Sequence, residues 1–169
     1  MNLVWIKRDI RIQDHQPLYE AESISEPYLI VYIFEKNFIQ KPDTGGRHLR
    51  FIYQSITDFN QRLSKLNKNI EIFYGDSMEV FSFLIMQFKI KKVFSYQESG
   101  TKYSWDRDKK VGNFLKKNNI SWIEYQRDGI IRGIKNRKGW NESWDAQMNK
   151  KIIKNQFKFQ EKIDFKNPF

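Results

Sequence analysis

The fold is decided by the stretch Tyr28-Leu29-Ile30-Val31-Tyr32-Ile33-Phe34. Its seven successive apolar residues are rich in β-branched and aromatic side chains, which favour strands. A strand covered on one face only would alternate apolar and polar residues, and this stretch does not. Residues 28–34 therefore predict a strand that is buried on both faces in a parallel sheet.

The other runs of strand length are shorter. They cover residues 3–6, 70–74, 93–96 and 121–125. The runs at 70–74 and 121–125 alternate, so we expect these two strands to lie nearer the edges of the sheet. The sequence thus predicts five strands.

A long helix is predicted between the second and third strands. Apolar residues recur there at spacings of three and four, which places them on one stripe that begins after Thr44-Gly45-Gly46. The stripe consists of Leu49, Ile52, Ile56, Phe59, Leu63 and Leu66. Further helices are expected after Pro17, after the cap Asp76-Ser77, and from Ser99-Gly100-Thr101 to Asn118-Asn119.

Strands that alternate with helices imply right-handed crossovers and a parallel sheet with helices on both faces. We therefore expect a Rossmann-like, doubly wound α/β fold with a five-stranded parallel sheet. By analogy with doubly wound folds, the expected strand order is 3-2-1-4-5. Such sheets bind ligands beyond the carboxyl ends of the strands, where the winding reverses. The residues after strands one and four are thus the expected ligand site.

Length and composition limit the class of protein. The chain has 169 residues, 40% hydrophobic and 16% aromatic, which suits one compact domain with a sizeable core. It has neither a stretch of about 18 uncharged apolar residues nor a signal peptide, so we expect a soluble, cytoplasmic protein without a membrane partner. The absence of cysteine and the separation of His15 from His48 argue against a metal site and against most hydrolase mechanisms.

The formal net charge of +10 favours an anionic partner. Residues 132–169 hold 10 basic and 4 acidic side chains, more than half of the excess. The basic and aromatic residues interleaved there could bind single-stranded nucleic acid, or could form a linker whose tryptophans pack on another domain. A lysine-rich proteome would give the same surplus without a nucleic-acid ligand.

We divide the chain into an α/β domain, residues 1–131, and an exit segment, residues 132–169. Residues 150–169 carry apolar side chains without a helical or strand period. This suggests a chain without its packing partner, so we expect these side chains to be mobile or to bury themselves on a neighbouring molecule. They are Phe157, Phe159, Ile163, Phe165 and Phe169.

Charged residues follow the first and fourth strands. Arg8 and Arg11 flank Asp9 and could hold a planar anion, with Asp9 orienting a guanidinium group. The alternative is an internal salt-bridge cluster that pins the loop. Glu98 and Gly100 stand beside a helix start, which suits a ligand with ring N–H donors or an anionic group, and equally an ordinary strand-to-helix turn.

These residues together resemble the N-terminal domain of the DNA photolyase/cryptochrome family. The segment from Leu3 to Arg11 is similar to the family's hydrophobic strand followed by Arg-Asp-Leu-Arg, with Lys7, Ile10 and His15 as departures from the usual residues. The collinear matches are Asp14 and Pro17-Leu18, Gly46-Arg47 with Phe51, Gly75-Asp76 before Val80, Glu98 with Asp106-Arg107-Asp108, and Gly139-Trp140 with Trp144-Asp145.

The resemblance implies the light-harvesting antenna domain of a two-domain flavoprotein, joined by the exit segment to a helical C-terminal domain that binds FAD. It implies that the full-length protein is a deoxyribodipyrimidine photolyase, a carbon–carbon lyase that repairs DNA with light, or a blue-light-sensing cryptochrome. Because the FAD pocket would lie outside residues 1–169, we expect this chain to have no catalytic residue and no repair activity by itself.

The resemblance further implies an antenna chromophore, which in this family is a folate, a deazaflavin or a flavin, at the carboxyl ends of the strands. The positions that carry over are Arg8, Asp9, Arg11, Phe34, Glu35, Arg47, Arg50, Tyr96, Gln97, Glu98 and Gly100. Glu98 is the residue most suggestive of a carboxylate that recognises a ring. The alternatives are a free-standing nucleotide-binding α/β module and a basic nucleic-acid-binding module without a chromophore.

Overall fold

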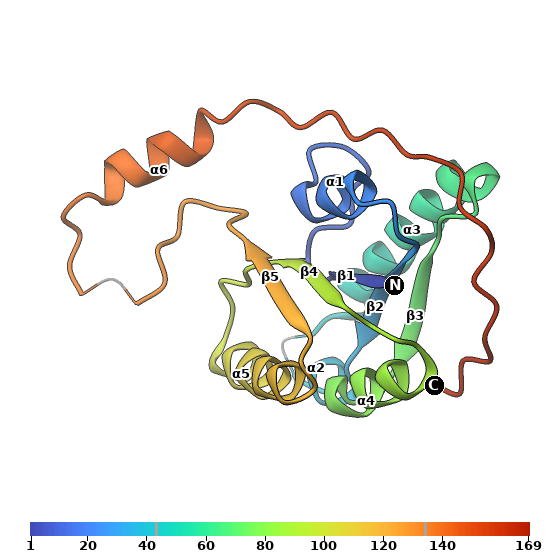
Figure 1. Cartoon of the computed structure of the whole chain (residues 1–169). Helices are drawn as coiled ribbons and strands as arrows, with labels where there is room; N and C mark the ends of the chain where they lie inside the picture. Colours follow the sequence, from blue (N-terminus) through green and yellow to red (C-terminus); the bar gives the residue numbers. More distant parts are fainter. Residues whose placement is uncertain (43, 134) are drawn as a thin grey trace.

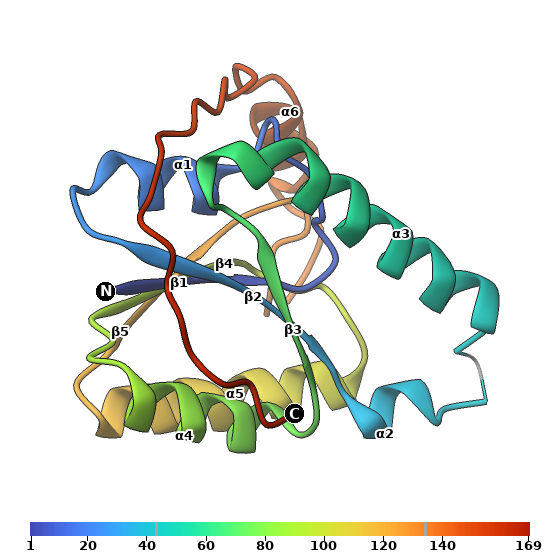
Figure 2. The same cartoon turned by 90° about the vertical axis from the view of Figure 1, so that its right-hand side faces the viewer.

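The computed structural model of the chain describes residues 1–42, 44–133 and 135–169. Within these residues five strands form one parallel sheet in the order β3-β2-β1-β4-β5, which confirms the predicted topology (Figures 1 and 2). The strands are β1 (Asn2–Ile6), β2 (Tyr28–Phe34), β3 (Ile70–Tyr74), β4 (Lys92–Tyr96) and β5 (Ser121–Tyr125). The winding reverses between β1 and β4, so their carboxyl ends are where a ligand is expected.

The burial of the strands follows their sequences. β2 lies between β1 and β3, with Ile30 opposite Val4 and Ile70, and the residues from Tyr28 to Ile33 are buried. The alternating strands β3 and β5 form the two edges of the sheet, as predicted. Continuous and alternating apolar runs thus distinguish inner from outer strands in this sheet.

Helices cover both faces of the sheet. Those of the described residues are α1 (Gln16–Ser23), α2 (Lys36–Ile39), α3 (Gly46–Leu63), α4 (Ser77–Gln87), α5 (Lys102–Lys117) and α6 (Trp140–Met148), with the 3₁₀ turn η1 (Ser64–Leu66) after α3. α1 and α3 lie on one face, and α4 and α5 lie on the other (Figure 1). A search of the described residues finds no helix with the length and apolar character that a membrane crossing requires.

Successive strand residues point to opposite faces, so the core has two layers. On the side of α4 and α5, the ring of Trp5 packs edge-on against Phe81, with 5.0 Å between the ring centroids. On the side of α1 and α3, Val4 and Ile6 pack in a cluster with Phe59. β1 contributes to both layers, which explains why its five residues are all buried.

The long helix α3 covers the sheet with only part of its length. Ile56, Phe59 and Leu63 of the predicted stripe are buried against the sheet. Leu49 and Ile52 are only partly buried, because the first half of α3 extends past the strands (Figure 2). This overhang forms one wall of the pocket described below.

The exit segment folds back over the domain, so the expectation of a tail without a packing partner is wrong for most of its apolar residues. Residues 150–169 form neither helix nor strand, yet they run past α1 and then beside β3 towards α4 (Figures 1 and 2). Phe157, Ile163, Phe165 and Phe169 pack against the two core layers, whereas Phe159 is 66% exposed.

Candidate functional site

A tight turn after β1 brings charged residues to the carboxyl end of the sheet. Oδ1 of Asp9 accepts hydrogen bonds of 3.0 Å from the backbone N–H groups of both Lys7 and Arg8. Oδ2 of Asp9 lies 2.7 Å from Nε2 of His15. Asp9 therefore stabilises the turn, as in the loop-pinning interpretation, and does not orient a guanidinium group.

The environment of Asp9 favours its ionised form. Burial by itself would raise the pKa of this carboxyl, since the side chain is almost completely inaccessible to water. The hydrogen bond with His15 and the backbone N–H of Lys7 outweigh burial and hold the pKa of Asp9 below its usual value. The turn thus contains a permanent negative charge at neutral pH.

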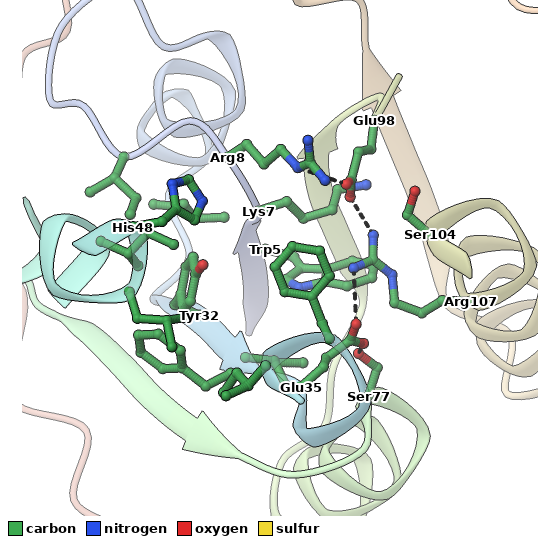
Figure 3. Close-up of a pocket in the computed structure, with 18 of the residues that line it drawn as sticks. Trp5, Lys7, Arg8, Tyr32, Glu35, His48, Ser77, Glu98, Ser104 and Arg107 are labelled. Carbon is green, nitrogen blue, oxygen red and sulfur yellow. Dashed lines mark hydrogen bonds and ion pairs between the residues drawn. The ribbon is translucent and has the colours of Figure 1, made fainter. Parts of the chain in front are cut away.

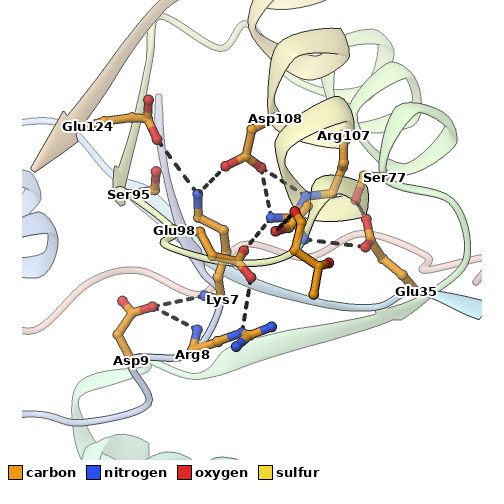
Figure 4. A network of polar contacts seen from close by, with 12 residues as sticks. Lys7, Arg8, Asp9, Glu35, Ser77, Ser95, Glu98, Arg107, Asp108 and Glu124 are labelled. Carbon is orange, nitrogen blue, oxygen red and sulfur yellow. Dashed lines mark hydrogen bonds and ion pairs between the residues drawn. The ribbon is translucent and has the colours of Figure 1, made fainter. Parts of the chain in front are cut away.

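Arg107 links the elements around the site. Its guanidinium group lies 2.5 Å from Oε2 of Glu98, 3.3 Å from Oε2 of Glu35 and 2.8 Å from Oδ1 of Asp108 (Figure 4). Burial alone would lower the pKa of Arg107, but Asp108, Glu35 and Glu98 outweigh it and raise this pKa. Arg107 on α5 therefore ties together the loop after β4 and the residue that follows β2.

Glu98 stands where two arginines meet. Its Oε1 lies 3.0 Å from Nε of Arg8, and its Oε2 pairs with Arg107. The side chain of Glu98 is 5% exposed, whereas that of Arg8 is 44% exposed. Gly100 leaves room for the Glu98 carboxylate because it has no side chain. A Cβ at Gly100 would lie 3.0 Å from Oε1 of Glu98 and would collide with Oγ of Ser104.

A pocket opens beside this network at the carboxyl ends of β1 and β2 (Figure 3). Its volume is about 240 Å³. A cavity of about 150 Å³ is known to hold one benzene ring, so this pocket has room for a fused ring system. It is closed by the first half of α3, by α2 and by the start of α5, and all three elements contribute lining residues.

The two walls of the pocket differ in character. One wall is polar and is formed by Arg8, Glu35, Ser77, Glu98, Ser104 and Arg107. The other is mainly apolar and is formed by Ile6, Tyr32, Phe34, Phe38, Ile39, Leu49 and Ile52. Figure 3 shows Tyr32 and His48 across the pocket from Glu98 and Arg107. A planar ring could lie on the apolar wall and direct its polar edge towards Glu98 and the arginines.

The tyrosines of the pocket remain neutral over the physiological range. Burial raises the pKa of Tyr32, and the charge of Glu98 adds to this effect. Burial and the nearby Glu35 carboxylate raise the pKa of Tyr103 to about 12. Both phenols are therefore hydrogen-bonding groups without charge.

A second group of charges lies beneath the turn, towards β5. Nζ of Lys7 lies 3.2 Å from Oδ2 of Asp108 and 3.8 Å from Oε1 of Glu124 (Figure 4). Burial lowers the pKa of Lys7 and raises the pKa of Glu124. Arg132 approaches the same carboxylates, at 3.6 Å from Glu124 and 4.0 Å from Asp108.

The whole network is electrically balanced. Its cations are Lys7, Arg8, Arg107 and Arg132, and its carboxylates are Glu35, Glu98, Asp108 and Glu124. Four positive charges therefore face four negative ones. This arrangement offers both donors and acceptors to a polar ring.

Four of the residues carried over from the family resemblance line the pocket. They are Arg8, Phe34, Glu35 and Glu98. Gly100 and Gln97 belong to the same loop after β4; Gly100 makes room for Glu98, and the N–H of Gln97 bonds to the carbonyl of Tyr125. The structure thus brings Glu98 and Arg8 of the predicted set together at the pocket.

The other carried-over residues lie outside the pocket lining. Asp9 is buried in the turn, and Arg11 and Tyr96 meet around Asp14 beside α1. Arg47 and Arg50 are exposed on the first turns of α3. Their role in binding a ligand remains a prediction.

Sequence reasoning missed several residues of the lining, above all Arg107. The signal for Arg107 was present, because Ser104, Arg107 and Asp108 precede the buried Val111 and Leu115 at spacings of three, four and seven on the inner face of α5. Other lining residues that were missed are Lys7, Tyr32, Phe38, His48, Ser77 and Tyr103. They come from elements that meet only in the folded chain.

Comparison with known proteins points in one direction. A family model described as DNA photolyase matches residues 2–134. The chloroplastic/mitochondrial cryptochrome DASH of Arabidopsis thaliana is 28% identical over 105 residues, which are 59% of this chain and 18% of that protein. The cryptochrome DASH of Gloeobacter violaceus is 29% identical over 101 residues, 57% of this chain and 20% of that protein. The chain thus spans about a fifth of these curated relatives.

Solved structures share the fold. An archaeal photolyase from Sulfolobus tokodaii with two FAD molecules superposes with a TM-score of 0.76 at 20% identity, over 95% of this chain and 38% of that one. A Synechocystis cryptochrome superposes with a TM-score of 0.77 at 16% identity, over 99% of this chain and 39% of that one. At these sequence identities the superpositions show a shared fold and nothing more.

Proposed function

The chain belongs to the DNA photolyase family, and from this premise we propose that its pocket binds a light-harvesting antenna chromophore. The family assignment identifies the chain as an N-terminal photolyase/cryptochrome domain. A light-driven protein of this kind gains from a second chromophore that absorbs light and passes the energy on. The position of the pocket at the carboxyl ends of the strands and its mixed polar and apolar lining support this proposal.

One observation carries the proposal: the carboxylate of Glu98 faces the pocket between Arg8 and Arg107. A carboxylate has about four lone-pair positions, and the two arginines use one on each oxygen. Glu98 can therefore accept further hydrogen bonds from ring N–H groups without losing either partner. Arg8 and Arg107 would donate to ring carbonyl oxygens at the same edge.

The chemistry of the pocket favours a particular class of chromophore. Since the charge network is balanced, binding energy would come from the apolar wall and from directed hydrogen bonds rather than from net charge. Folates, flavins and deazaflavins each carry a fused, planar heterocycle whose edge alternates N–H and carbonyl groups. The Sulfolobus tokodaii photolyase, described with two FAD molecules and a novel light-harvesting cofactor, makes a flavin a reasonable member of this set.

The remaining functions belong to the complete protein. We propose that residues 1–131 form the antenna domain and that the exit segment leads to a helical domain that binds FAD and contacts DNA. The complete protein would then repair pyrimidine dimers with light as a carbon–carbon lyase, or would sense blue light. A dimer-repair assay under blue light separates these two outcomes.

The binding site is tested by titration of the complete protein with methenyltetrahydrofolate, flavin mononucleotide and a deazaflavin. Binding is followed by the change in chromophore absorbance and fluorescence. We expect one of the three to bind, and Glu98→Ala to raise its dissociation constant at least tenfold. The matched control is Glu26→Ala, because the Glu26 carboxylate also pairs with a basic side chain, that of Lys91, but lies away from the pocket. Unchanged affinity in Glu98→Ala would place the chromophore elsewhere.

The antenna role has its own readout. Light absorbed by the bound chromophore should sensitise the flavin, so the excitation spectrum of flavin photoreduction should contain the chromophore band. Glu98→Ala should remove that band and leave the flavin band in place. A chromophore that binds without any band in this spectrum would contradict an antenna function.

A further inference from the structure

The exit segment is hydrogen-bonded to the loop that connects β1 to α1. The side-chain amide of Asn155 accepts a 2.9 Å hydrogen bond from the N–H of His15 and donates a 2.9 Å bond to the carbonyl of His15. Gln13 forms a similar pair with the backbone of Asn155, at 3.0 and 3.1 Å. Ile153 forms two further hydrogen bonds with Asp14, of 2.9 and 3.1 Å.

Asn155 is built into the domain. Its side chain is buried, and both of its polar groups are satisfied by the backbone of one residue, His15. Asp14 next to it has a positive φ of 54°, a conformation that L residues rarely adopt. The bonds from Ile153 and from Arg11 to Asp14 stabilise this conformation. These hydrogen bonds therefore hold the loop in a backbone conformation that its residues rarely adopt by themselves.

The side chain of His15 extends from this loop into the protein interior. Its ring is completely buried, and Nδ1 accepts a 3.2 Å hydrogen bond from the N–H of Leu18. Since Nδ1 is an acceptor, the ring proton is on Nε2, from which it is donated to Asp9 at 2.7 Å. Asp9 in turn holds the N–H groups of Lys7 and Arg8. Hydrogen bonds from Asn155 to the backbone of His15, and from the ring of His15 through Asp9, thus connect Asn155 to the backbone of the pocket residue Arg8.

We propose that Asn155 is a positioning residue for the pocket and acts through His15 and Asp9 on Arg8. By fixing the backbone of His15, Asn155 places the imidazole where Asp9 can close the turn, and the turn directs Arg8 towards Glu98. The inference rests on the proposed function in taking this pocket as the chromophore site. It adds that the docking of the exit segment and the occupancy of the pocket are coupled, and such coupling acts in both directions.

The chain provides a matched control at the other end of the tail. Asn167 also uses its side chain to hold the domain, through a 2.8 Å bond from Nδ2 to the carbonyl of Ile72 on β3. Asn167 is not among the residues that line the pocket and has no bond to the turn after β1. Oδ1 of Asn167 also accepts a 3.0 Å bond from the N–H of Phe169, so each substitution removes two side-chain hydrogen bonds, and only Asn155→Ala should affect Arg8.

The first test needs no ligand and uses amide hydrogen exchange in the complete protein. Asn155→Ala should speed the exchange of the Lys7 and Arg8 amides about tenfold and leave Ile30 in the central strand unchanged. His15→Ala should have the same effect, and the double variant should add little to either single one. Asn167→Ala should leave both amides as in the wild type. Unchanged exchange at Lys7 and Arg8 in Asn155→Ala, or an equal rise at Ile30, would overturn the proposal.

The second test repeats the three chromophore titrations. Asn155→Ala should weaken the binding of the chromophore about fivefold, and Asn167→Ala should not change it. A wild-type protein that binds none of the three contradicts the proposed function, while the exchange experiment still decides whether Asn155 holds the turn. Tight binding that Asn155→Ala leaves unchanged contradicts the coupling and leaves the proposed function intact.

Discussion

Asp9 shows how a single buried charge can organise a loop. The side chain is 4% exposed, and a buried carboxylate is tolerated only when hydrogen bonds compensate for the lost hydration. Asp9 obtains this compensation from two backbone N–H groups and from His15. Its negative charge is therefore part of the folded structure, and the turn after β1 depends on it.

We expect Asp9→Asn to destabilise the protein by roughly 1.5 to 3 kcal/mol at pH 7, because hydrogen bonds to a charged group are worth that much. The folded-state pKa of Asp9 lies below its unfolded value of about 3.9. Its contribution is thus complete above about pH 5 and is lost as the pH falls through the folded-state pKa. Urea unfolding at pH 7 and at pH 3 measures the difference, which should shrink at the lower pH.

The control for Asp9 is Asp58 on the surface of α3. Asp58 is 59% exposed and pairs with Arg62 one helical turn away, a contact that is worth little in water. Asp58→Asn should therefore change the free energy of unfolding by less than about 0.5 kcal/mol. An equal effect of the two substitutions would mean that burial of Asp9 has no special importance.

At the scale of the element, α3 serves two functions along its length. Its second half packs on the sheet through Ile56, Phe59 and Leu63. Its first half overhangs and supplies Leu49 and Ile52 to the pocket. A single apolar stripe therefore provides both core and binding wall, and the sequence period alone does not tell the two apart.

We expect Ile56→Ala to cost 2 to 5 kcal/mol, roughly the range for truncation of a buried Ile that leaves a cavity. Ile56 is 1% exposed and belongs to the core layer beneath α1 and α3. Tyr53→Ala, one turn earlier on the same helix, is the control, since Tyr53 is 60% exposed. Chemical denaturation of both variants measures the contrast. A loss below about 0.5 kcal/mol for Ile56→Ala would show that the stripe faces solvent.

The strands and long helices were predictable because each depends on a local period. The continuous run at 28–34 predicted an inner strand and the alternating runs at 70–74 and 121–125 predicted the edges, while the full strand order came from analogy with doubly wound folds. The pocket was harder to predict, because its walls come from several elements. Glu98 was found from its position after a strand. Arg107 was missed because charged helix residues are usually solvated, and only the folded chain places this one against three carboxylates.

At the scale of the whole molecule, the exit segment binds the domain through apolar and amide side chains together, which no apolar period in the sequence reveals. Its backbone is extended and each anchor is separate: Asn155 on the loop after β1, Gln160 on Tyr28, and Phe165 in the aromatic cluster near α4. The covered residues are two apart, at 153, 155 and 157 and again at 163, 165, 167 and 169, but amides such as Asn155 and Asn167 stand among them, so an apolar pattern does not show this spacing. The sequence reasoning therefore misjudged a packed tail as one without a packing partner.

Phe165 gives the sharpest test of this packing. Its ring lies 5.3 Å from that of Phe88 and 6.3 Å from those of Phe73 and Phe83, so the tail extends the core beyond α4. Phe165→Ala should cost about 1 to 3 kcal/mol, because removing this partly buried ring re-exposes the aromatic cluster to water. Phe159→Ala is the matched control in the same segment, since Phe159 is 66% exposed and should lose less than about 0.5 kcal/mol.

If the tail instead detached from the domain in solution, the two phenylalanines would be equivalent. Both substitutions would then leave the free energy of unfolding unchanged, and the amides of Asn155 and Gln160 would exchange as fast as those of an unfolded peptide. Asn155 and Phe165 anchor the same segment at separate places, the loop after β1 and the aromatic cluster near α4. Phe165→Ala should therefore leave the amides of Lys7 and Arg8 protected from exchange. The hydrogen bonds that hold the loop after β1 do not involve the aromatic cluster.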